Sequence, residues 1–96
     1  MFPDKVKILG HEYKILPEEN YVVQSGGETG EVNNYLNVIR IGKELTPSGQ
    51  MEILLHEILE AINYRLELNL DHPKLCILSE VLHQVLRDNR LSFYGR

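Results

Sequence analysis

The sequence predicts a single α+β domain over residues 1–96, and three observations support this. Residues 1–42 contain short runs in which apolar and polar residues alternate, which is the pattern of strands with one buried face. Residues 46–68 and 73–89 have the apolar periodicity of helices. The strands come first and the helices follow, an order typical of α+β folds. We therefore expect a small sheet packed against two C-terminal helices.

An N-terminal β-hairpin is expected over residues 5–16, because apolar side chains alternate on both sides of Gly10–His11. Gly10 would supply the positive φ that a tight hairpin turn requires. Residues 21–23 (YVV) are expected to be extended, and residues 25–30, which include three glycines, to form a mobile loop. Residues 35–41 (YLNVIRI) predict one further strand, which ends at Gly42.

Each predicted helix has a recognisable start. Thr46 and Pro47 provide an N-cap residue and a proline in the first turn of the helix over residues 46–68. Asn69 to His72 break the helical pattern, and Pro73 begins the second helix. Both helices are expected to pack on the sheet.

The composition limits the classes of function. The net charge of −4, with no basic stripe, argues against a nucleic-acid partner. No apolar run reaches membrane-spanning length, and the N-terminus lacks the apolar core of a signal peptide. Cys76 is the single cysteine, so no internal disulfide can form, which is typical of a reducing compartment. A cytoplasmic location without membrane insertion is therefore expected, whereas no oligomeric state follows from the sequence.

The segment His56–Glu60 (HEILE) differs by one residue from H-E-x-x-H, the helical metallopeptidase motif with two ligands one turn apart and a glutamate base. On a helical wheel, His56 and Glu60 share one narrow polar stripe with Glu52, and apolar residues cover most of the remaining circumference. One interpretation is that the stripe is the solvated edge of the helix. The other is that it lines a cleft. Glu57 favours the second, because it falls among apolar residues, where a carboxylate without a partner is costly.

With these residues, the chain resembles the zincin superfamily of metallopeptidases, in particular its glutamate-ligand branch and the small zincin-like proteins encoded by phages and prophages. The resemblance rests on residues 39–41 (IRI), residues 50–63 (QMEILLHEILEAIN) and residues 78–89 (LSEVLHQVLRDN), and more weakly on the hairpin. Glu60 departs from the family, which has histidine at this position.

The resemblance implies a metal site and a peptidase activity. His56, Glu60 and Glu80 would be the metal ligands, and Glu57 the general base that acts on metal-bound water. Residues 39–41 would border the cleft and align a peptide or protein substrate by backbone pairing. Zn²⁺ is the first expectation for the metal. Because one imidazole with two carboxylates is a harder donor set than usual, Mn²⁺ and Fe²⁺ are alternatives.

Several alternatives stay open at the level of sequence. Glu60 in place of histidine also fits an inactive phage accessory or interaction protein that uses the same scaffold without metal. His72 and His83 are alternative ligands, and the pattern of Glu80 to His83 (EVLH) matches the E-x-x-H spacing of di-iron carboxylate bundles, which only a dimer of this chain could build. Glu80 itself lies on the polar side of its helix, as exposed glutamates do. No role is predicted for Cys76.

Overall fold

The computed structural model describes residues 3–91 and confirms the α+β class. The expected hairpin is formed by β1 (Lys5–Ile8) and β2 (His11–Glu18), which pair antiparallel. The turn consists of Leu9 and Gly10, whose φ angles are 52° and 83°. Two successive positive φ values match the right-handed twist of the two strands, so the turn holds the pair in register.

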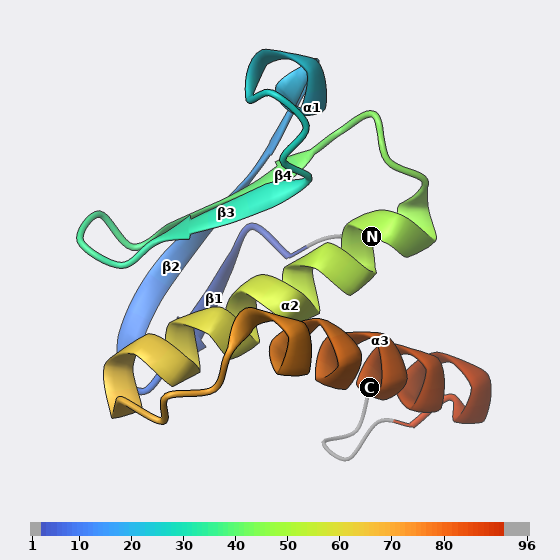
Figure 1. The fold of residues 1–96 in the computed structure, drawn as a ribbon. Coiled ribbons are helices and arrows are strands. Elements are labelled where there is room, and N and C mark those ends of the chain that lie inside the picture. Colours follow the sequence, from blue (N-terminus) through green and yellow to red (C-terminus); the bar gives the residue numbers. More distant parts are fainter. Residues whose placement is uncertain (1–2, 92–96) are drawn as a thin grey trace.

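The sheet has four strands in the order β1-β2-β4-β3, where β3 spans Gly30–Asn33 and β4 spans Val38–Gly42. β2 and β4 pair in parallel, and the two outer pairs are antiparallel. The expected single further strand is therefore two strands. β3 was not predicted, because its four residues follow a glycine-rich segment and carry only one large apolar side chain, Val32. β4 is inside the sheet, and β3 forms its edge (Figure 1).

The predicted strand over residues 35–41 begins too early. Tyr35 and Leu36 lie in the β3–β4 turn, where both backbone N–H groups donate to Asn33 Oδ1 at 2.9 Å. Asn37 follows with a φ of 56°. An asparagine side chain that satisfies backbone donors replaces the ladder hydrogen bonds of a strand, so the turn ends only at Val38.

The prediction of an extended segment over residues 21–23 was wrong. Tyr21–Gln24 form a single helical turn, α1, after Asn20, whose φ is 59°. The N–H of Gln24 donates to Asn20 O at 3.0 Å and that of Ser25 to Tyr21 O at 2.9 Å. Three apolar residues suit a buried strand or a helical turn equally well, and here the left-handed Asn20 turns the chain into a helix.

Helix α2 (Pro47–Leu66) lies across one face of the sheet, and α3 (His72–Asn89) packs beside α2 (Figure 1). Thr46 Oγ1 accepts from the N–H of Gly49 at 3.0 Å, as expected of an N-cap. The cap of α3 is Asp71, whose Oδ1 accepts from the N–H of Lys74 at 2.9 Å. His72 is therefore inside the first turn of α3 instead of in the preceding break.

The core lies between the sheet and α2. Its buried members are apolar residues from β1, β2, β4 and α2: Ile8, Tyr13, Ile15, Ile39, Ile41, Leu54 and Ala61. α3 contributes little to it, because only Leu75 and Ser79 are buried on this helix.

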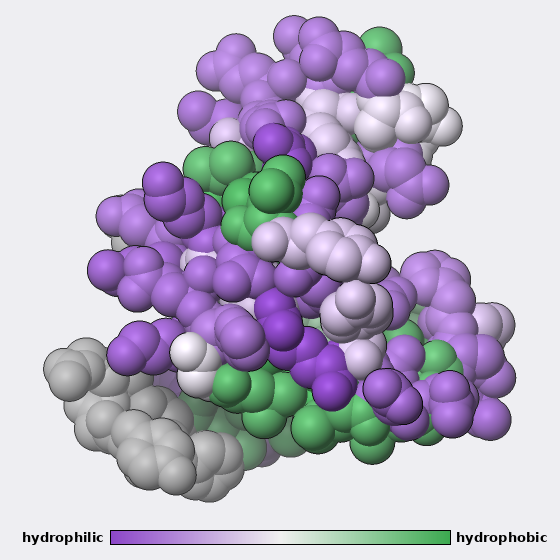
Figure 2. Space-filling view, turned by 90° about the vertical axis from the view of Figure 1, so that its left-hand side faces the viewer, coloured by the Kyte–Doolittle hydropathy of each residue, from purple (hydrophilic) through white to green (hydrophobic). Residues whose placement is uncertain are grey.

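The outer side of the helices is less polar than most of the surface. Ile77 and Val81 of α3 are 62% and 52% exposed. Figure 2 shows one face on which hydrophilic residues predominate. Hydrophobic residues gather along its lower part, at the height of α3 in Figure 1, and in a smaller group in its upper half. Within residues 3–91, no helix has the length and apolar character needed to cross a membrane.

Candidate metal centre

His56 lies on the side of α2 that faces α3, and only 7% of it is exposed. Its Nδ1 is 3.3 Å from Ser79 Oγ of α3. Ser79 donates its own proton to Cys76 O at 3.0 Å, so its oxygen is free to accept from His56 Nδ1–H. This arrangement leaves the lone pair of a neutral His56 ring on Nε2. A histidine whose Nδ1–H is held by a protein acceptor is the form that binds metals.

The Nε2 atom of His56 points to Glu60, one helical turn further along α2. Glu60 Oε2 is 3.3 Å from His56 Nε2 and 3.1 Å from His72 Nδ1. One carboxylate oxygen thus contacts an imidazole from each helix, and the two rings stand edge to face, with centroids 5.3 Å apart. The structure therefore brings His56 and Glu60 together, as the sequence indicated, and adds His72 from α3.

Cys76 completes this group. Its Sγ is 3.4 Å from His72 Nε2, one turn along α3. The ligand atoms of His56, His72 and Cys76 all lie within 4.8 Å of one another. In a tetrahedral zinc site, neighbouring nitrogen, oxygen and sulfur ligands are about 3.3 to 3.6 Å apart, so small side-chain adjustments would let these donors share one ion. Imidazole nitrogen and thiolate sulfur are the donors that zinc prefers.

The group of His56, Glu60, His72 and Cys76 is called the α2–α3 cluster below. The sequence analysis left His72 as an open alternative and predicted no role for Cys76. The signal that could have found both was their spacing of one helical turn at the start of the second helix, which matches that of His56 and Glu60.

Glu80 is exposed on α3, but it lines the same cavity as His56, Glu57 and Cys76. His83 lies elsewhere: its Nε2 is 3.2 Å from Ser48 Oγ, and its side chain lines a separate apolar cavity with Met51 and Leu86. Among the predicted ligands and their alternatives, His72 is thus the histidine that contacts the motif.

Glu57 is buried between α2 and β3, with 7% of the residue exposed. Its Oε2 is near Gly30, 3.5 Å from where a Cβ would lie. Burial, with smaller contributions from the carboxylates of Glu60, Glu31 and Glu28, raises the pKa of Glu57 from 4.5 to about 8. No hydrogen bond or ion pair from the described residues stabilises its charged form. A carboxyl group with such a pKa can accept a proton near neutral pH.

Two adjoining cavities form a cleft between α2, α3 and β3. They measure about 220 and 460 Å³, and both are lined by Glu28, Gly30, His56, Glu57 and His72. The smaller continues to Glu80 along α3, and the larger continues along β3 to Asn34. The motif glutamate and the α2–α3 cluster therefore share one solvent-accessible space.

The strand beside this cleft is β3, not residues 39–41. These residues belong to β4, which has both edges paired within the sheet. Ile39 and Ile41 are fully buried, and Arg40 Nε donates to Glu18 Oε2 at 2.9 Å. The expectation that residues 39–41 pair with a peptide was wrong, because no backbone edge is free there. Among residues 3–91, β3 pairs only with β4.

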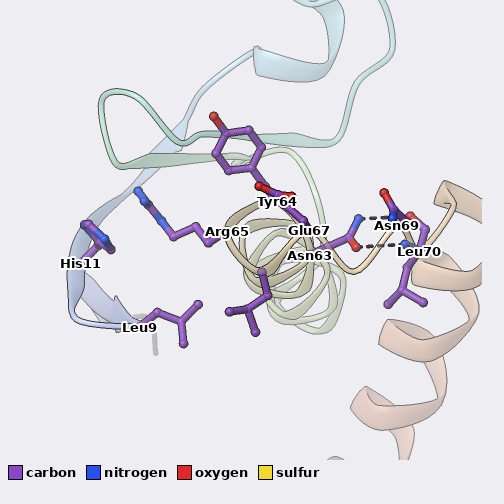
Figure 3. A pocket seen from close by; sticks show the side chains of 9 residues that line it. Leu9, His11, Asn63, Tyr64, Arg65, Glu67, Asn69 and Leu70 are labelled. Carbon is purple, nitrogen blue, oxygen red and sulfur yellow. Dashed lines mark hydrogen bonds between the residues drawn. The ribbon is translucent and has the colours of Figure 1, made fainter.

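A further cavity, of about 880 Å³, lies at the other end of α2 and contains none of the predicted site residues (Figure 3). It is an open groove between the β1–β2 turn and the α2–α3 connection. Arg65, on one wall, is already engaged: it donates to Tyr13 Oη at 2.6 Å and to Asn37 Oδ1 at 2.8 Å. Its contacts are structural, since they join the sheet to the end of α2.

The site and the fold together define a class: a small α+β domain with a mixed imidazole, carboxylate and thiol cluster beside a buried glutamate. No protein-family model, curated protein or solved structure matches the chain.

Proposed function

We propose that this protein is a divalent-metal-dependent peptidase of the zincin-like type, of phage or prophage kind, with Zn²⁺ as the first candidate metal. The observation that carries the proposal is the shared cleft: the α2–α3 cluster and the unpaired, buried Glu57 line the same cavities. A metal centre and a carboxyl base in one cleft are the two parts that metal-assisted hydrolysis requires.

The donor set fits a divalent cation. His56, Glu60 and His72 already converge, so these three residues would hold the ion in place of the Glu80 that the family resemblance implied and would leave a fourth position for water; Cys76 lies beside them. When bound, such an ion lowers the pKa of water and polarises a carbonyl group. Glu57 would take the proton from the attacking water and later deliver it to the leaving amine, because its raised pKa allows both states near neutral pH.

The edge strand β3 supports a peptide as the substrate. Gly30, Glu31 and Val32 line the larger cavity opposite His56 and Glu57. An extended segment paired with this edge would lie across the cleft, with main-chain hydrogen bonds fixing its position.

The test is a comparison of wild-type protein with Glu57→Gln. Protein purified without chelator should contain one equivalent of divalent ion, which His56→Ala and His72→Ala should remove. Metal-loaded wild type should cleave members of a mixed peptide library followed by mass spectrometry. Glu57→Gln should keep the metal and lose about 10²- to 10⁴-fold of the rate, as for a general base. Glu19→Gln, which changes an exposed glutamate outside the cleft, is the matched control.

A second candidate function is favoured by the thiol of Cys76. Four protein ligands close a tetrahedral zinc site and leave no position for water, as in structural zinc sites. The protein would then be an inactive interaction module stabilised by metal. Stoichiometric metal, a higher melting temperature on metal addition and no hydrolysis of any library peptide would favour this function over the peptidase.

A further inference from the structure

The cleft carries more negative charge than a metal site needs. Six carboxylates line its two cavities: Glu28, Glu31, Glu52, Glu57, Glu60 and Glu80. Neither cavity is lined by a lysine or arginine of the described chain. Arg40 binds Glu31 at 3.4 Å, but its shorter contact is to Glu18, and it lies outside both cavities. With Glu57 protonated, five charges remain, and a divalent ion would balance only two of them.

A further observation concerns Glu57, which lines both cavities. Glu57 is more than nine-tenths buried, faces the cavity space, and has no protein partner among residues 3–91. A buried carboxyl group without a protein partner leaves its hydrogen-bonding capacity to a ligand in the cavity.

The smaller cavity is lined by carboxylates that the proposed function uses neither as metal ligands nor as the base. Glu52 of α2, Glu80 of α3 and Glu28 of the segment before β3 line it from three different segments. None of the three is needed as a ligand if His72 completes the metal set with His56 and Glu60. Its volume of about 220 Å³ is below the 300–1,000 Å³ of pockets for drug-sized ligands, and suits one side chain.

We propose that this cavity receives a lysine or arginine side chain of the peptide substrate, with Glu28, Glu52 and Glu80 as its carboxylate partners. The inference rests on the proposed peptidase function, since it names the substrate class of the same cleft. Glu80 thus becomes a specificity residue instead of a metal ligand. Acidic peptides are excluded by the same charges.

The experiment separates binding from hydrolysis. Metal-loaded Glu57→Gln protein is titrated with fluorescent peptides that carry lysine, norleucine or glutamate at one scanned position in an uncharged host. Norleucine keeps the aliphatic stem and lacks the charge. At one position, lysine should bind at least about tenfold more tightly than norleucine, and added salt should weaken only the lysine peptide. In the wild type, lysine should lower KM at that position more than it changes kcat.

Glu80→Gln and Glu52→Gln should each reduce the lysine preference about three- to tenfold without loss of bound metal, and Glu19→Gln should not. Equal affinity for lysine and norleucine at every position overturns the inference, even if peptides are cleaved. A lysine preference without any cleavage supports the cation site and overturns the peptidase. Loss of metal in Glu80→Gln would return Glu80 to the ligand set and also overturn the inference.

Discussion

At the scale of single residues, the surroundings of His56 show that a residue which positions a ligand cannot always be recognised from the sequence. The motif indicated His56, Glu57 and Glu60, and the structure places these three around one cleft. Ser79, which is 1% exposed and contacts His56 Nδ1, could not be predicted. A serine in the sequence of an amphipathic helix is normally expected at the surface. Only the packing of α3 on α2 places Ser79 beside the imidazole ring of His56.

We expect Ser79→Ala to weaken metal binding about 10- to 100-fold while the fold is kept, because a ligating histidine loses the acceptor that fixes its tautomer. Competition with a chelating dye measures the affinity, and circular dichroism checks the fold. Ser48→Ala, at an exposed serine that lines neither cavity of the cleft, is the matched control. An unchanged affinity would mean that Ser79 has only a packing role.

At the scale of elements, strong local sequence patterns were sufficient to predict the helices and the hairpin, and weak patterns were not sufficient to predict the shorter elements. Both helices and the hairpin follow from periodicity, caps and Gly10, and the structure confirms them. β3 and α1 have four residues each, which is too few to show the periodicity of apolar and polar side chains that identifies a strand or a helix. Their secondary structure depends on the surrounding chain. β3 forms because it pairs with the edge of β4 that β2 leaves open, and α1 follows the left-handed Asn20. The order of the strands likewise depends on pairing between distant segments.

The hairpin turn contains an unfavourable residue that gives a direct test. Leu9 has a φ of 52°, a left-handed conformation that is unfavourable for leucine. Its side chain is 53% exposed, so burial offsets little of this cost. Leu9→Asn creates the Asn-Gly pair that such turns prefer, and we expect it to raise the free energy of unfolding by about 1 kcal/mol. Urea denaturation measures the change. Leu9→Ala, which keeps the backbone penalty, should give no comparable gain.

At the scale of the whole molecule, the acidic cleft makes stability depend on pH. Glu57 has its pKa raised from 4.5 to about 8, mainly by burial, so the folded state binds a proton that the unfolded state releases. The resulting stability is fully present below pH 4.5 and is lost as pH rises through about 8. Each unit of the shift corresponds to about 1.4 kcal/mol, so the loss amounts to several kcal/mol.

Metal-free wild-type protein should therefore unfold more easily at pH 8.5 than at pH 5, and Glu57→Gln should remove most of this difference. Chemical denaturation across this range, with chelator present, gives both curves. Glu19→Gln should follow the wild type. Parallel curves for wild type and Glu57→Gln would show that the carboxyl group is not held in its neutral form.

The connection between the two helices has a consequence for how an ion would be captured. Asn63 of α2 donates from Nδ2 to Leu70 O at 3.1 Å and accepts the N–H of Leu70 at Oδ1 at 3.0 Å. This two-point clamp fixes the chain just before His72, which is visible in Figure 3. The metal donors of α2 and α3, which lie on both sides of this connection, are thus brought together when the chain folds. Ion binding therefore does not have to order them, and its entropic cost is smaller. Uptake should then be fast and leave the backbone almost unchanged.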